Sequence, residues 1–135
     1  MINWIHQEHE YGCGIACLAM VCNSTYKQVK DWFLKHNIDI EAKNGGSFFE
    51  WELYLSEHGY SNTRRFKTIN GIEREEWPPK ILGKINLCQV STKSNRGHAI
   101  VLLADGTILD PYSEYNMSLS DYKSVDNILS IYKIE

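Results

Sequence analysis

The sequence predicts an α+β fold in which N-terminal helices pack on an antiparallel β-sheet. Apolar residues recur at helical spacing in the segments before Gly59, whereas the later segments are mixed polar and β-branched, as strands are. An Asp105-Gly106 pair between two apolar runs is typical of a β-hairpin turn. Because helices come first and strands follow, we expect a helical layer packed on one sheet.

The first two predicted helices differ in how much of their surface is apolar. Residues 13–22 (CGIACLAMVC) are apolar on nearly every side, so we expect a buried central helix whose N-terminus follows Gly12. Ser24 is the predicted N-cap of a second, amphipathic helix that runs to residues 36–37. The central helix should therefore be covered on all sides by the rest of the fold.

A third helix is predicted to follow an Asn-Gly-Gly turn at residues 44–46. Ser47 is its expected N-cap, and Gly59 is expected at its C′ position. The segments that follow predict strands, separated by an acidic, proline-bearing loop at residues 73–79. The predicted strands span residues 60–68, 80–92, 98–104, 107–110 and 128–134.

Size and charge narrow the class of protein. The 135 residues, 43% of them hydrophobic, suffice for one core, so we expect residues 1–135 to form a single domain. The formal net charge is -3 and no basic stripe occurs, which disfavours nucleic acid as a partner. No charged leader precedes an apolar run, and no segment approaches the ~18 apolar residues of a membrane span. We therefore expect a cytoplasmic protein without a membrane partner.

The four cysteines form a poor disulfide framework, because three of them crowd one short apolar segment and only Cys88 lies elsewhere. We expect reduced thiols. The spacing lacks CxxC pairs, which disfavours structural zinc, and we expect no metal ion or cofactor. Cys17 and Cys22 are interpreted as small core residues, which is the usual role of free cysteine.

Cys13 differs from the other cysteines because it stands at the predicted N-terminus of a helix. Unpaired N–H groups and the positive end of the helix dipole stabilise a thiolate at such a position, which makes it a nucleophile. Gly12 and Gly14 on either side allow a substrate backbone to approach closely. The alternative is that Cys13 is a core residue like Cys17.

His98 and Asp110 are the candidate partners of that thiol. His98 opens a predicted strand, and Asp110 follows the return of the hairpin. Antiparallel neighbours joined by a tight turn lie side by side, so Asp110 is expected near His98, where it could orient the imidazole ring. The alternative is that His98 is a boundary residue and Asp110-Pro111 a strand terminator.

Together these residues resemble a known family, the bacteriocin-processing, or double-glycine, cysteine peptidases of the papain-like clan. The resemblance covers most of residues 4–111 and is weak between residues 67 and 97. It is carried by the run Gln7-x5-Cys13-Gly14-x-Ala16-Cys17-Leu18-Ala19-Met20, by His98 before an apolar strand, by Asp110-Pro111, and by Gly46-Ser47 and His58-Gly59-Tyr60 in the middle region.

The resemblance implies a papain-like fold and a peptide or protein substrate. It also implies that Cys13 attacks the carbonyl carbon, His98 shuttles the proton and Asp110 orients the imidazole ring. Gln7 would complete the oxyanion hole beside the backbone N–H of Cys13. The expected activity is cleavage of a peptide or isopeptide amide bond through an acyl-enzyme on Cys13.

The sequence departs from the family at Gly12, where an acidic residue is usual, and in its short hairpin between His98 and Asp110. It also lacks a GxxxxGK[ST] motif, so we expect a stand-alone domain without an ATP-binding partner domain. Deamidation or acyl transfer would use the same residues. A further alternative is a non-catalytic papain-like protein, encoded by a phage or mobile element, that binds and inhibits a host partner.

Overall fold

The computed structural model describes residues 2–41, 47–66, 68–69, 72–73 and 84–134. The helices are α1 (Cys13–Val21), α2 (Tyr26–Lys35), α3 (Phe48–Glu57) and the short 3-10 helix η1 (Leu119–Asp121). The strands are β1 (Tyr60–Phe66), β2 (Thr68–Ile69), β3 (Ile72–Glu73), β4 (Ile85–Ser91), β5 (Gly97–Leu103), β6 (Ile108–Leu109) and β7 (Ser124–Lys133). The predicted turn at 44–46, residues 74–79 of the predicted loop and residues 80–83 of a predicted strand lie outside the described residues.

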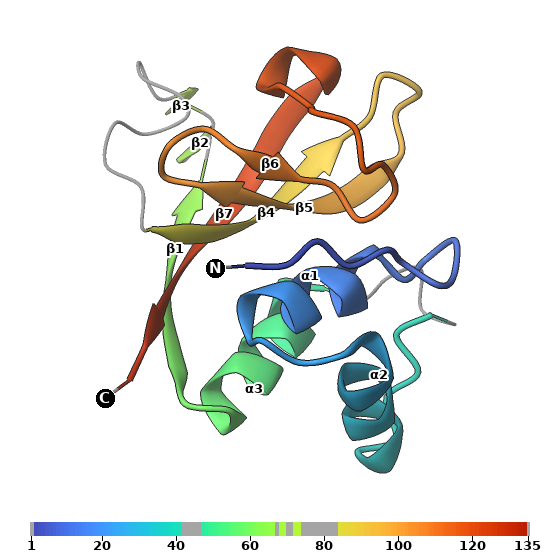
Figure 1. The fold of residues 1–135 in the computed structure, drawn as a ribbon. Helices are drawn as coiled ribbons and strands as arrows, with labels where there is room; N and C mark the ends of the chain where they lie inside the picture. The colour runs from blue at the N-terminus through green and yellow to red at the C-terminus, as the bar shows by residue number, and fades with distance from the viewer. Residues whose placement is uncertain (1, 42–46, 67, 70–71, 74–83, 135) are drawn as a thin grey trace.

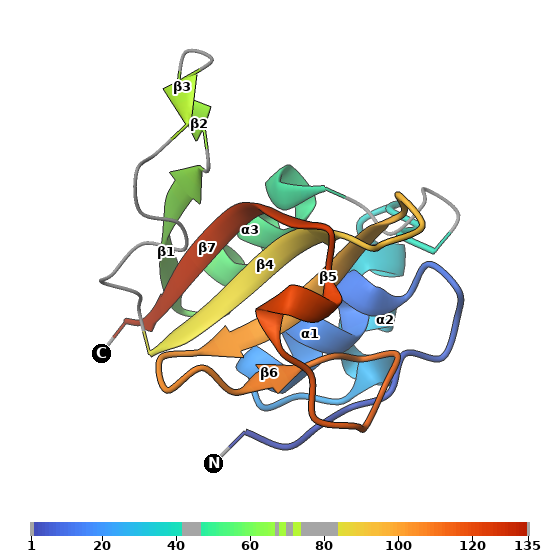
Figure 2. The same ribbon diagram turned by 90° about the horizontal axis from the view of Figure 1, so that it is seen from above.

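A five-stranded antiparallel sheet, in the order β1-β7-β4-β5-β6, carries the α helices on one face (Figures 1 and 2). The last strand, β7, lies inside the sheet between β1 and β4. Strands β2 and β3 form a separate two-stranded antiparallel sheet that the sequence did not predict. The α+β architecture with helices packed on an antiparallel sheet is confirmed.

Helix α1 is at the centre of the fold, and every one of its residues is buried. It contacts β4 and β5 as well as both other α helices. Its core cluster includes sheet residues that face the helices, namely Leu87, Ala99, Val101, Leu129 and Ile131. A helix that is apolar all round can be stable in water only when such neighbours cover it on every side.

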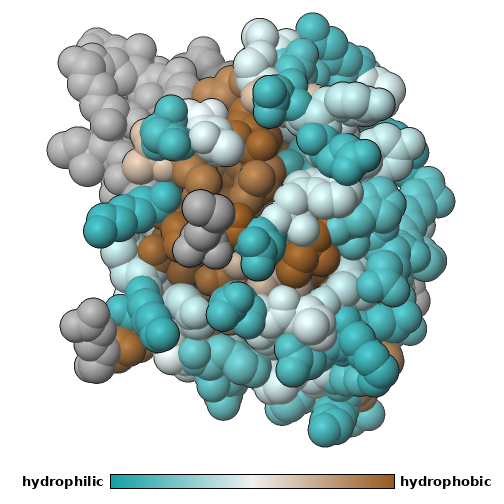
Figure 3. Space-filling view, viewed as in Figure 1, coloured by the Kyte–Doolittle hydropathy of each residue, from teal (hydrophilic) through white to brown (hydrophobic). Residues whose placement is uncertain are grey.

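The opposite face of the sheet has a smaller core of its own. It contains alternate residues of the same strands, together with side chains from the segment between β6 and β7. The buried members are Cys88, Val90, Ile100, Leu102, Ile108, Tyr122, Val125 and Ile128. Figure 3 shows hydrophobic side chains gathered over the sheet, whereas polar side chains cover the helices below it. The sheet therefore has apolar side chains on both faces.

The predicted N-cap of α2 was wrong by one residue. Thr25, and not Ser24, caps this helix, and its side chain accepts a hydrogen bond from the backbone N–H of Gln28. The Gln28 side chain in turn accepts from the N–H of Thr25, which completes a capping box that Ser24 could not form. Ser24 instead donates its backbone N–H to the carbonyl of Ala19.

The ends of the other helices agree more closely with the prediction. Helix α1 ends at Val21, one residue earlier than expected. Ser47 is the N-cap of α3, although its side chain makes no capping hydrogen bond. Gly59 follows the C-cap residue with a φ of 83°, a left-handed conformation that favours glycine at this position.

Strand β7 begins four residues earlier than predicted, at Ser124. Its register with β4 shifts between Gln89, which faces Asn127, and Val90, which faces Val125. Asp126 is thus the extra residue of a β-bulge, and the bulge places Val125 and Ile128 on the same face of the sheet. This irregularity breaks the alternation on which a strand prediction relies.

The residue before α1 is tightly enclosed. A Cβ atom on Gly12 would lie 2.0 Å from the hydroxyl oxygen of Tyr26. That hydroxyl is fixed in place because it donates to Glu41 at 2.6 Å, and Glu41 also pairs with Lys30 at 2.7 Å. The glycine in place of the family's usual acidic residue therefore leaves room for a buried side chain of α2.

We predict that Gly12→Ala destabilises the folded protein by about 1–3 kcal/mol, because the new methyl group must displace Tyr26 from a packed site. Gly97→Ala is the matched control, since a Cβ there would have no atom within 4 Å, and it should change stability by less than about 0.5 kcal/mol. Urea titration of both variants measures the difference. Equal destabilisation of the two variants would contradict this prediction.

Candidate active site

One cleft, with a volume of about 710 Å³, contains all of the site residues predicted from the sequence. It lies where the start of α1 meets the start of β5 and the end of β6. Its lining comprises Gln7, Glu10, Tyr11, Cys13, Thr92, Ser94, Arg96, Gly97, His98, Asp110, Tyr112, Ser113, Met117, Asp121 and Tyr122. The fold thus brings together residues from both ends of the chain.

Cys13 is the first residue of α1, and only 8% of its surface is exposed. The first intrahelical hydrogen bond runs from Ala16 N–H to the carbonyl of Gly12. The N–H groups of the first turn, including that of Cys13, therefore have no partner inside the helix and are available to an anion at this position.

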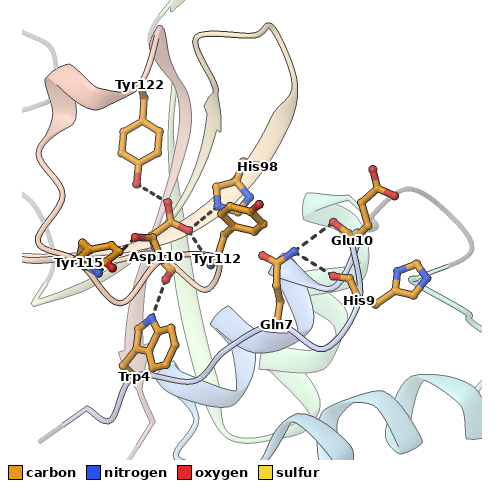
Figure 4. Close-up of polar contacts among 10 residues, drawn as sticks. Trp4, Gln7, His9, Glu10, His98, Asp110, Tyr112, Tyr115 and Tyr122 are labelled. Atoms are coloured by element: carbon orange, nitrogen blue, oxygen red, sulfur yellow. Dashed lines mark hydrogen bonds and ion pairs between the residues drawn. The ribbon is translucent and has the colours of Figure 1, made fainter.

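His98 is held by its Nε2 atom, which lies 2.7 Å from Oδ1 of Asp110 (Figure 4). Nδ1 is the ring nitrogen that Asp110 leaves free, and the ring also interacts with the side chain of Cys13. Burial of the ring disfavours the charged form, but the hydrogen bond to Asp110 and the interaction with the Cys13 thiol outweigh it. The pKa of His98 is raised from 6.5 to about 9 as a result.

Asp110 is buried, and its carboxylate accepts three hydrogen bonds. Oδ1 accepts from His98 and from the backbone N–H of Tyr112 at 2.8 Å, whereas Oδ2 accepts from the hydroxyl of Tyr122 at 2.7 Å. Burial raises the pKa of Asp110, but the contact with His98 and these hydrogen bonds outweigh it, so the pKa lies below its ordinary value. The indole of Trp4 donates to the backbone carbonyl of Asp110 at 2.6 Å and holds the same residue from the N-terminal segment.

Gln7 lines the cleft, but its amide nitrogen is already engaged. Nε2 donates to the carbonyls of His9 and Glu10 at 3.0 and 3.2 Å. Oε1 is buried and has no hydrogen-bond partner among the described residues, and Figure 4 shows it on the side of the amide that faces His98. In this orientation the side chain presents an acceptor to the cleft, and not the donor that an oxyanion hole needs.

Sequence reasoning missed Tyr122 and Trp4 as neighbours of Asp110. Neither lies in a recognisable motif. Trp4 is 106 residues from Asp110, and Tyr122 is 12 residues away but is not joined to Asp110 by a hairpin, so no local signal could have identified them. It also missed an ion pair between Glu10 and Arg96, whose atoms lie 2.5 Å apart at the edge of the cleft. This pair joins the loop before α1 to the turn between β4 and β5.

The other three cysteines lie in the core clusters or beside them and are free thiols. Burial raises the pKa of Cys22 and of Cys88 to about 12, and burial also raises that of Cys17. These thiols are therefore poor nucleophiles at neutral pH. Within the described ranges, no three His, Cys, Asp or Glu side chains are grouped so that they could hold a metal ion.

We predict that the protein loses stability as the pH rises from about 6.5 to about 9. Because the pKa of His98 is higher in the folded state, its protonated form stabilises the fold fully below pH 6.5 and no longer does so above about 9. The free energy of unfolding, measured by urea titration, should fall by up to about 3 kcal/mol over this interval. Asp110→Asn should remove most of the decline. A flat wild-type profile would contradict the raised pKa.

Comparison with protein families matches residues 1–101 to the Peptidase C39 family. A comparison with curated proteins finds no match. No helix in the described part of the chain is long and apolar enough to cross a membrane. The helices and the five-stranded antiparallel sheet fit the papain-like fold of this family, which confirms the resemblance seen in the sequence. Because the match covers most of the chain and includes Cys13 and His98, the chain belongs to the Peptidase C39 family.

Proposed function

We propose that the chain is a cysteine peptidase that cleaves a peptide or isopeptide amide bond through an acyl-enzyme on Cys13. One observation carries this proposal: in a single cleft, Asp110 engages Nε2 of His98 and leaves Nδ1 for the thiol at the start of α1. We further propose that residues 1–135 act as one catalytic domain in the cytoplasm, where four free thiols would remain reduced.

Acylation follows from this arrangement. Before attack His98 carries the proton, because its pKa is raised to about 9, and Cys13 reacts as its thiolate at the positive end of α1. The sulfur attacks the substrate carbonyl carbon, and the electron pair of the C=O bond moves to the oxygen. As the tetrahedral intermediate collapses, Nδ1 of His98 gives its proton to the leaving amine. The products are a thioester on Cys13 and a free amine.

Deacylation uses the same residues in reverse. Neutral His98 removes a proton from a water molecule, whose oxygen attacks the thioester carbonyl. The C–S bond breaks, the acid product leaves, and the thiolate–imidazolium pair forms again. Asp110 stays ionised throughout and keeps the ring oriented, because three donors stabilise its charge.

Gln7 is proposed as the oxyanion donor, together with the backbone N–H of Cys13. Its amide must first turn by about half a rotation, so that Nε2 leaves the carbonyls of His9 and Glu10 and faces the cleft. This rotation breaks both hydrogen bonds and turns Oε1 towards two carbonyl oxygens, so the new bond from Nε2 to the charged oxyanion must compensate for them.

A non-catalytic or inhibitory protein is the alternative that the resting Gln7 supports, because its donor is not ready for an oxyanion. Deamidation and acyl transfer are further alternatives, since they differ only in the leaving group or in the acceptor that replaces water. Product analysis separates these reactions: hydrolysis releases two chain ends, deamidation releases ammonia, and transfer yields a new amide.

We predict that Cys13→Ala abolishes cleavage, by at least about 10³-fold, and changes stability by only roughly 1 kcal/mol. His98→Ala should act similarly, whereas Asp110→Asn should retain more activity because it keeps a hydrogen-bonding side chain. Cys17→Ala is the matched control, since the same change in the core should leave the catalytic rate intact. Turnover of a peptide library by each variant, with a melting curve, provides the test. Full activity of folded Cys13→Ala would overturn the proposal.

We also predict that Cys13 is the first thiol to be alkylated in the native protein. It lines the cleft beside His98, whereas burial keeps Cys17, Cys22 and Cys88 protonated. Brief treatment with iodoacetamide, followed by peptide mass spectrometry, identifies the modified residue. Cys22 is the most exposed of the other three, so faster labelling at Cys22 would show that the nucleophile is misassigned.

A further inference from the structure

Tyr122 is the only donor to Oδ2 of Asp110 among the described residues. Its hydroxyl lies 2.7 Å from that oxygen, and both side chains are buried. The other carboxylate oxygen, Oδ1, serves His98 and the backbone N–H of Tyr112. Figure 4 shows Tyr122 approaching Asp110 from the side opposite Trp4. The carboxylate is therefore held by two different segments while it engages the imidazole ring.

The position of the Tyr122 hydroxyl is fixed by the backbone around it. Ser118 and Asp121 form a capping box around η1, and the N–H of Tyr122 donates to the carbonyl of Leu119 at 3.2 Å. The next N–H, of Lys123, donates to the carbonyl of Ser91 at the end of β4. The ring itself packs in the smaller core cluster, on the face of the sheet opposite the α helices. These contacts leave the phenol little freedom to move away from Asp110.

We propose that Tyr122 is a positioning residue of this site, and that its hydroxyl fixes the rotation of the Asp110 carboxylate so that Oδ1 meets Nε2 of His98. The inference rests on the proposed function, because it assigns Tyr122 to the same reaction. Without the donor to Oδ2 the carboxylate is held through Oδ1 alone, by His98 and the backbone N–H of Tyr112, and it can tilt about its Cβ–Cγ bond away from the imidazole ring. The segment after residue 101, which the family match does not cover, is thus needed to complete the site.

The charge of Asp110 provides a readout that does not depend on turnover. The titratable groups around this carboxylate are His98 from β5, Tyr122 after η1 and Cys17 from α1. Removal of the phenol hydroxyl leaves Oδ2 buried without a donor, so the pKa of Asp110 must rise. A residue that served only to pack the core would leave this pKa unchanged when its ring is kept.

The experiment compares Tyr122→Phe with Tyr115→Phe in the full chain. Tyr115 lies in the same segment, but its side chain is 79% exposed and makes no hydrogen bond to Asp110. We expect Tyr122→Phe to lower kcat about tenfold with little change in KM, since one hydrogen bond to a charged group is lost. Carboxyl ¹³C NMR should show that the Asp110 titration moves to higher pH. Tyr115→Phe should change neither quantity.

An unchanged Asp110 titration in folded Tyr122→Phe would overturn the inference, whatever the wild-type protein hydrolyses. Failure of the wild-type protein to cleave any peptide would instead overturn the proposed function, and the two results are therefore distinguishable. If Tyr122→Phe does not fold, ring ¹³C NMR of the wild-type protein gives a second measurement. The Tyr122 phenol should remain neutral above pH ~10, where free tyrosine ionises, because it is buried against the Asp110 carboxylate. Ionisation of Tyr122 near that pH would also overturn the inference.

Discussion

The complete burial of α1 is the constraint on which the rest of the structure depends. A helix with no polar face must be enclosed, and the sheet on one side and helices α2 and α3 on the other provide this enclosure. Of the residues of α1, Cys13 alone lines the cleft described above. The packing that buries α1 therefore also sets the position of Cys13. It places the N-terminus of the helix, whose first N–H groups have no partner within the helix, beside the start of β5.

Asp110 is where distant parts of the chain converge. Trp4 holds its backbone carbonyl, His98 and Tyr122 bind its carboxylate, and the backbone N–H of Gln7 donates to the neighbouring carbonyl of Pro111. A buried carboxylate would be costly without such partners, and here each partner also restricts its orientation. The fold buries the charge of the Asp110 carboxylate, and this charge raises the pKa of His98.

Sequence patterns predicted the architecture because its helices are strongly apolar or amphipathic, and they also indicated the residues that meet in the cleft. Cys13 follows from a helix start and Asp110 from a hairpin, which are both local features. Local features failed where two neighbouring residues could both cap a helix. Ser24 was the predicted N-cap of α2, but Thr25 takes this position because Gln28 completes a capping box with it. They also failed at Asp126, whose bulge hides the start of β7, and at Tyr122, whose role exists only once tertiary structure has formed.

The central place of β7 also bears on the order of events during synthesis. In the described sheet, β1 pairs with β7 alone, and β4 lies on the other side of the same strand. While residues 124–133 are still inside the ribosome, β1 has no partner strand. One edge of β4 is also unpaired. Pairing of β7 with both strands is then a late, long-range step, which requires the C-terminal segment to insert between neighbours that were made earlier. The sheet against which α1 packs is consequently complete only once residues 124–133 have taken their place in it.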